Sequence, residues 1–208
     1  MTTVNSVLRI AATCVCLGAM LAATPSASAQ PGLAAPAAGR VFNVARGGFS
    51  LEAPEGWERV QPKSGIVEVE FSIPTEAKGA DGAPLPAGRM TVMGAGGTVE
   101  ANIDRWYGQF TQPDGTSTKD RATTKKIDVA GCKVTLVDIP GTYKDSPGGP
   151  FAGGQAVERP GYRMLAAIVQ TGGDQGNHFL KFYGPAATVE KHAAGFQKMV
   201  EGMVKAGK

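Results

Sequence analysis

The chain has few of the residue types on which most site chemistry depends. Its 208 residues include three cysteines and two histidines, and aromatic residues make up 7% of the sequence. No His-x-x-x-His or Cys-x-x-Cys pair occurs, so the usual spacing of zinc ligands is missing and no metal or cofactor is expected. The formal net charge of +3 lacks the concentrated basic character that nucleic-acid binding requires.

Long hydrophobic runs are also scarce, and the one at the amino terminus is short. Arg9 precedes an apolar run over 10–23, and the small residues 27–29 follow it. This pattern is typical of a secretory signal over 1–29. The polar and proline residues at 24–26 end the run before the ~20 apolar residues that a membrane span needs. We therefore expect an exported protein, periplasmic or extracellular, with no stable membrane span once the signal is removed.

Glycine and proline, by contrast, are abundant, with 29 and 14 copies. Much of the excess falls in four segments, 30–40, 77–88, 94–97 and 145–161. Such segments form leaders, turns and loops, and the sequence between them is long enough to bury a core. The composition predicts a flexible leader over 30–40 and a single domain over 41–208.

Between these loops, the spacing of apolar residues switches several times between that of a strand and that of a helix. Strand-like alternation predicts strands over 66–73 and 162–170, the second apolar on both faces and therefore central. Helix-like stripes predict one helix after Thr98 that continues to Phe110, and another that opens at Pro185. In total the pattern predicts about seven or eight strands and two helices. Their order favours an α+β fold with an antiparallel central sheet flanked by helices.

Cys132 and His178 are the residues most open to a catalytic interpretation. Cys132 alternates in phase with apolar neighbours, which predicts a buried and inert thiol, and His178 has the phase of a histidine at the core edge. A reactive thiol activated by this histidine is the alternative, and it would make the protein a thiol-dependent or hydrolytic enzyme. We expect no enzyme and assign no catalytic residue.

A pair of glutamates and the second histidine could also carry chemistry, but the pattern around them indicates exposed surface. Glu68 and Glu70 lie roughly 6–7 Å apart by strand rise, a separation that glycosidases also use. The alternation around them instead predicts a solvated sheet face. His192, next to Lys191 on the last helix, is predicted to be solvated surface.

The segment 145–161 is the longest predicted loop, and long loops on a rigid scaffold often carry function. Bulky or charged residues frame its small ones, and we take them as candidate contacts with a protein or small ligand in the cell envelope: Lys144, Phe151, Arg159 and Tyr162. A loop with no ligand is the alternative. The sequence thus predicts a non-catalytic binding or accessory domain.

Three stretches carry a resemblance to a known family: FSLEAPEGWERV, VAGCKVTLVDIPGTY and HFLKFYGPAATVEKHAAGFQKMVEGM. They resemble the PsbP-like family of small exported α/β/α sandwich domains, which also includes Ran-binding members, over about 41–205. The resemblance implies an antiparallel central sheet with helices on its faces and an accessory or binding role. No photosynthetic partner motif and no Ran-contact signature is matched, so neither role is transferred.

Overall fold

A computed structural model describes residues 39–46, 48–146, 155–172 and 176–206 of the chain. The predicted signal over 1–29, nearly all of the predicted leader, and Phe151 lie outside the described residues.

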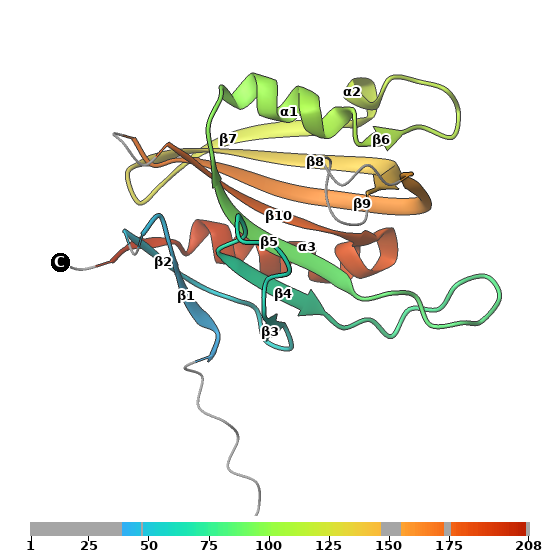
Figure 1. Ribbon diagram of the computed structural model, residues 1–208, viewed down its shortest axis with the longest axis horizontal. Coiled ribbons are helices and arrows are strands. Elements are labelled where there is room, and N and C mark those ends of the chain that lie inside the picture. The colour runs from blue at the N-terminus through green and yellow to red at the C-terminus, as the bar shows by residue number, and fades with distance from the viewer. Residues whose placement is uncertain (1–38, 47, 147–154, 173–175, 207–208) are drawn as a thin grey trace, which may run out of the picture. The chain divides into compact units, whose positions relative to one another are not determined.

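The described elements are mostly strands of very different length, with a few helices between and after them (Figure 1). The strands are β1 Val41–Val44, β2 Phe49–Glu52, β3 Glu58–Val60, β4 Val69–Ile73, β5 Gly88–Ala95, β6 Phe110–Thr111, β7 Thr123–Val129, β8 Cys132–Asp145, β9 Val157–Gln170, β10 Asn177–Pro185 and β11 Val204–Lys205. The helices are α1 Val99–Tyr107, α2 Thr118–Arg121 and α3 Ala186–Glu201.

An antiparallel sheet of eight strands forms the centre of the described part, in the order β3-β4-β5-β10-β9-β8-β6, with β7 paired to β8. A smaller sheet combines β1, β2 and β11. The predicted central strand over 162–170 is confirmed, because β9 lies between β10 and β8 and buries residues of both faces. The α+β fold class is likewise confirmed.

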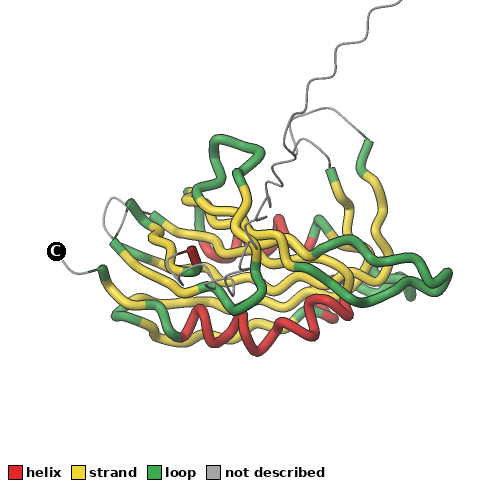
Figure 2. Tube along the Cα trace, turned by 90° about the horizontal axis from the view of Figure 1, so that it is seen from below, coloured by secondary structure: helices red, strands yellow, loops and turns green. Residues whose placement is uncertain are grey.

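One face of the large sheet packs against α3, and Figure 2 shows this helix lying along the sheet. The Phe182 side chain is fully buried here, with its ring centroid 5.1 Å from that of Trp57 and 6.1 Å from that of Phe196. Such aromatic packing joins sheet and helix through a large area of buried apolar surface.

The other face packs against α1, whose start agrees with the prediction. The backbone N–H of Ala101 donates to Thr98 Oγ1 at 3.1 Å, which caps the helix. Trp106 then packs edge-on against Phe179 of β10, with ring centroids 5.4 Å apart. We call the face of the large sheet that carries Phe179 the α1 face.

Three predicted boundaries are wrong. The helix ends at Tyr107 and does not reach Phe110, because Phe110 enters β6 and packs on Tyr143 with ring centroids 5.2 Å apart. The strand predicted over 66–73 begins only at Val69. The loop predicted over 145–161 is shorter, because β8 continues through Asp145 and β9 begins at Val157.

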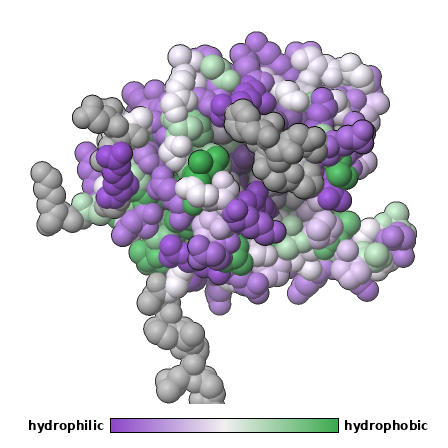
Figure 3. All heavy atoms as spheres, viewed as in Figure 1, coloured by the Kyte–Doolittle hydropathy of each residue, from purple (hydrophilic) through white to green (hydrophobic). Residues whose placement is uncertain are grey.

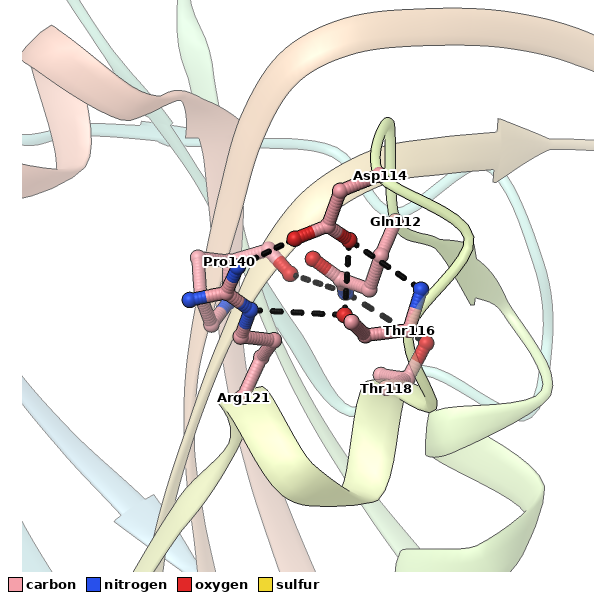
Figure 4. Close-up of polar contacts among 6 residues, drawn as sticks. All are labelled: Gln112, Asp114, Thr116, Thr118, Arg121 and Pro140. Atoms are coloured by element: carbon pink, nitrogen blue, oxygen red, sulfur yellow. Dashed lines mark hydrogen bonds and ion pairs between the residues drawn. The ribbon is translucent and has the colours of Figure 1, made fainter.

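The turn between β6 and α2 is held by polar contacts within itself, with α2 and with β8 (Figure 4). Gln112 Nε2 donates to the carbonyl of Pro140 in β8 at 2.8 Å. The Asp114 carboxylate accepts from the N–H and hydroxyl of Thr116 and pairs with Arg121. The Thr116 hydroxyl and then Arg121 lower the pKa of Asp114 well below its ordinary value. These contacts fix the turn that connects the short edge strand β6 to α2.

The prediction that His192 is solvated surface is also wrong. Trp57 Nε1 donates a hydrogen bond to Nδ1 of the half-buried His192 ring at 3.2 Å. His192 thus provides the acceptor that the N–H of the buried indole needs. Burial lowers the pKa of His192, Lys191 adds to this effect, and a contact with the Pro74 backbone opposes it. The folded protein therefore favours the uncharged ring.

We expect the domain to lose stability as the pH falls from about 7 to about 5. The unfolded state takes up a proton near the ordinary pKa of 6.5, whereas the folded state takes it up only at lower pH. The stability due to the uncharged ring is thus present above 6.5 and is lost as the pH falls through the lowered folded pKa.

The substitution His192→Asn keeps an acceptor oxygen near the position of Nδ1 and removes the titration. Thermal unfolding followed at several pH values should show a shallower decline for this variant than for the wild type. Some decline remains, because burial also lowers the pKa of His178. Equal slopes for the two proteins would contradict the assignment.

Candidate functional site

Aromatic and cationic side chains gather on the α1 face, beyond the part that α1 covers. The strand register places Arg89 of β5 opposite Tyr183 of β10, and Lys181 of β10 one position further along the same face. Residues of β8 and β9 continue the group. We call it the tyrosine–cation cluster, and its members are Arg89, Tyr143, Arg159, Tyr162, Lys181 and Tyr183.

Lys181 lies half-buried at the centre of the cluster. Its Nζ lies 5.0 Å from the ring centroid of Tyr183 and 5.3 Å from that of Tyr143, and it donates to Gln109 Oε1 at 2.6 Å. Among the described residues no carboxylate pairs with it within 4.0 Å. The nearest polar partner of this amine is therefore a neutral amide.

Two opposing effects act on the charge of Lys181. The ring contacts favour the ammonium form, by about 0.5–2 kcal/mol for contacts of this type, which corresponds to roughly one pKa unit. Burial favours the neutral amine by up to about 3–5 units. Burial, with the charges of Arg89 and Arg105 added and that of Asp145 opposing, lowers the pKa of Lys181 to about 7. The larger effect leaves a substantial neutral fraction at neutral pH.

Arg89 joins the cluster to a buried carboxylate. Its guanidinium binds Glu70 through two hydrogen bonds, Nε to Oε1 at 2.8 Å and Nη2 to Oε2 at 2.9 Å, and Nη1 donates to the Tyr183 hydroxyl at 2.7 Å. Only 3% of Glu70 is exposed. The Arg89 hydrogen bonds lower the pKa of Glu70, although burial opposes them. This pair fixes Arg89 and orients the Tyr183 ring.

The prediction that Glu68 and Glu70 share a solvated sheet face is therefore wrong. Glu70 is buried against Arg89, whereas Glu68 precedes β4 and has its Oε1 3.6 Å from Nε2 of His178. The two carboxylates have different partners and do not form a pair like that of a glycosidase.

Of the four residues predicted as ligand contacts, two lie in the cluster, one points to the other face of the sheet and one is outside the described residues. Arg159 lies opposite Tyr143 in the β8–β9 pairing and is 3.3 Å from Asp145 Oδ2, and the rings of Tyr143 and Tyr162 stack with centroids 6.2 Å apart. Lys144 lies opposite Glu158 and follows Tyr143 directly, so strand alternation points it to the other face. Phe151 is outside the described residues. Arg159 and Tyr162 thus lie in one cluster, together with residues that the sequence reasoning missed.

The strand register separates Cys132 from His178. Cys132 lies on β8 and His178 on β10, with β9 between them, and neighbouring strands are about 4.8 Å apart. The β8 residue in the same row as His178 is Val134, two positions beyond Cys132. Cys132 is buried, as predicted, and its burial raises the pKa of the thiol. The separation and the protonated thiol both oppose direct activation of Cys132 by His178.

Two hollows lie outside the cluster. One of about 350 Å³ is lined by residues 59–65 and 67–70, and another of about 620 Å³ lies between the start of α1 and strands β7 and β8. The surface drawn in Figure 3 is mostly hydrophilic, with apolar residues in separate areas. No helix in the described ranges has the length and apolar character needed to cross a membrane.

Comparisons with known proteins give a likeness in structure alone. No protein-family model matches the chain, and no curated protein matches it in sequence. The structure is similar to cyanobacterial PsbP from Synechocystis, at 12% identity and a TM-score of 0.48 over 85% of this chain and 97% of that one. It is also similar to a protein of unknown function from Pseudomonas aeruginosa, at 11% identity and a TM-score of 0.43 over 81% of this chain and 97% of that one.

A third similar structure is the Ran-binding protein Mog1p from Saccharomyces cerevisiae, at 10% identity and a TM-score of 0.42 over 80% of this chain and 94% of that one. The Synechocystis protein bears the name of the family that the three quoted sequence stretches resemble. At these identities the three likenesses concern the fold alone.

Proposed function

We propose that the chain is an exported, non-catalytic binding domain that contacts a protein partner through the tyrosine–cation cluster. The observation that carries this proposal is the convergence of three tyrosines and two arginines from four adjacent strands on one face. Tyrosine and arginine are enriched among the residues that dominate binding energies at protein interfaces. Export rests on the signal-like segment over 1–29.

The positions of these side chains support a preformed contact surface. Tyr143 and Tyr162 are stacked, Tyr183 accepts a hydrogen bond from Arg89, and Arg159 lies against Asp145. Side chains held on strands lose little conformational freedom on binding, so more of the interaction energy is retained as affinity. The side chain of Arg159 remains 43% exposed and is available to a partner.

The charges in and around the cluster favour a partner surface that carries carboxylates. Glu70 and Asp145 offset Arg89 and Arg159, whereas Arg105, at the end of α1, has only the Asn102 amide as a hydrogen-bond partner among the described residues. Lys181 adds positive charge in its protonated form. Complementary charge of this kind directs the orientation of the complex and accelerates association.

We expect the double substitution Tyr162→Ala with Arg159→Ala to weaken capture of the partner at least tenfold. Residues of these types at the centre of an interface contribute about 2 kcal/mol or more each, and tenfold corresponds to 1.4 kcal/mol. Purified variants are immobilised, exposed to the exported fraction of the source cells, and compared by quantitative mass spectrometry of the bound proteins.

The matched control is Lys191→Ala, on α3 at the other side of the large sheet, where the lysine side chain is 58% exposed. Thermal unfolding should confirm that both variants remain folded at the temperature of capture. Equal recovery of every bound protein by the wild type and the folded double variant would contradict the proposed surface.

A further inference from the structure

The surroundings of Lys181 differ from those of an ordinary surface lysine. The adjacent rings of Tyr143 and Tyr183 both lie within 5.3 Å of its Nζ, and Gln109 accepts one of its hydrogens. The charges that act on it are those of Arg89 and Arg105, with Asp145 as the opposing carboxylate. By contrast, Lys133 and Lys191 have side chains 74% and 58% exposed, and each is paired with a carboxylate.

This arrangement has a chemical consequence. A neutral amine that donates one hydrogen to Gln109 keeps its lone pair free, and a lone pair on an uncharged lysine is the nucleophile in reactions with carbonyl groups. Partial burial of the amine and the charges of the nearby arginines favour such an amine and outweigh the opposing ring contacts, and the pKa of about 7 agrees with this balance. The same arginines attract a negatively charged reactant.

We infer that Lys181 is a site of reversible covalent capture of small carbonyl compounds that carry a carboxylate or phosphate, such as short oxo acids. Lys181 belongs to the tyrosine–cation cluster proposed above as the partner surface, but covalent capture at its amine does not require that the cluster bind a protein. It adds a ligand class that the binding function does not require.

The reaction balances without an oxidant or a reductant. The Nζ lone pair forms a bond to the carbonyl carbon, and the C=O π electrons move to oxygen. Two protons leave nitrogen and two reach the oxygen in the course of the reaction, the C–O bond breaks, and one water molecule departs. A C=N bond remains, and the addition of water reverses it.

Reductive labelling of the full folded chain at pH 7 tests the inference. Glyoxylate serves as the anionic carbonyl probe and formaldehyde as the uncharged one, and cyanoborohydride supplies the hydride that converts the imine to a stable secondary amine. Peptide mapping by mass spectrometry gives the rate at each lysine. Lys133 and Lys191 provide the internal reference, and a parallel reaction in concentrated urea removes the folded environment.

We expect glyoxylate to label Lys181 at least ten times faster than the reference lysines in the folded protein, and at about the same rate as them in urea. At pH 7 an amine with a pKa of about 7 is half neutral, whereas an ordinary lysine is neutral to only about 1 part in 2,500. Arg105→Gln should slow the glyoxylate reaction at Lys181 more than the formaldehyde reaction, because it removes the attraction for the anion as well as one of the charges that lower the pKa of Lys181.

Glyoxylate labelling of Lys181 no faster than that of Lys133 would overturn the inference. A fast reaction that shows the same preference for glyoxylate over formaldehyde in the wild type and in Arg105→Gln would overturn the anionic ligand class. Neither result depends on whether a protein partner is captured, so the two proposals fail separately.

Discussion

Replacement of Phe182 by alanine is expected to lower the free energy of unfolding by about 3–5 kcal/mol. The ring is fully buried between the sheet and α3, against Trp57 and Phe196. The Phe182 ring also lies so close to Gly88 that a Cβ atom at Gly88 would come within 2.9 Å of it. Closely packed surroundings of this kind relax little, so the substitution leaves a cavity. Urea unfolding followed by circular dichroism measures the change.

A matched control is Val60→Ala on the edge strand β3, where the valine is 37% exposed. This change should alter the free energy of unfolding by no more than about 0.5 kcal/mol. Phe182→Leu should fall between the two variants. If Phe182→Ala cost less than about 1 kcal/mol, which is typical of surface positions, the packing of α3 on this face would have to be revised.

The sequence predicted those parts of the fold that local pattern determines. The apolar run over 162–170 identifies the central strand because both of its faces need cover. Ala130 and Gly131 are a two-residue connection of the kind typical of tight hairpins, and they join β7 to β8 with positive φ at both residues, 51° and 76°. Thr98 caps α1 because its side chain can satisfy a free backbone N–H within one turn.

The boundaries that were missed depend on partners distant in sequence. The sequence around 157–159 predicts a loop because it is rich in glycine and proline, yet these residues pair with the far end of β8 beyond a register shift next to Gly141. Gly141 adopts φ +143°, and a Cβ there would lie 2.7 Å from the carbonyl oxygen of Thr111. No local period encodes such a pairing, because it depends on the close approach of a third strand.

The candidate site was predicted in part for the same reason. Arg159 and Tyr162 stand out as large side chains among small ones, but alternation places Lys181 on the polar side of its strand and gives no sign of burial. Its environment comes from Tyr143 and from Gln109, the latter 72 residues earlier in the chain. Alternation likewise places Glu70 on a wet face, whereas its burial depends on Arg89 of the neighbouring strand.

Replacement of Arg89 by alanine is expected to lower the free energy of unfolding by about 2–4 kcal/mol at pH 7, somewhat below the 3–5 kcal/mol typical of a broken buried pair. The reduction reflects the exposure of the Arg89 side chain, which is 36%, against 4% for that of Glu70. The variant leaves a buried carboxylate without its guanidinium and the Tyr183 hydroxyl without its donor. Urea unfolding at pH 7 measures the loss.

The double variant Glu70→Gln with Arg89→Ala separates the buried charge from lost packing. It should recover part of the stability, because an uncharged amide is less costly to bury than an unpaired carboxylate. If the double variant were no more stable than Arg89→Ala alone, the loss would come from packing of the arginine stem rather than from the carboxylate.

The pH dependence gives an independent test of the same pair. In the wild type Arg89 lowers the pKa of Glu70, so the resulting stability is present above the ordinary value of 4.5 and is lost as the pH falls through the folded pKa. Without Arg89, burial is the largest remaining effect and raises the pKa of Glu70. Protonation of Glu70 at acidic pH then removes the cost of burying an unpaired carboxylate in the variant. The stability difference between wild type and Arg89→Ala should therefore shrink as the pH falls from 7 toward about 4. A difference that stays constant over this range would show that the Glu70 charge is not what Arg89 stabilises.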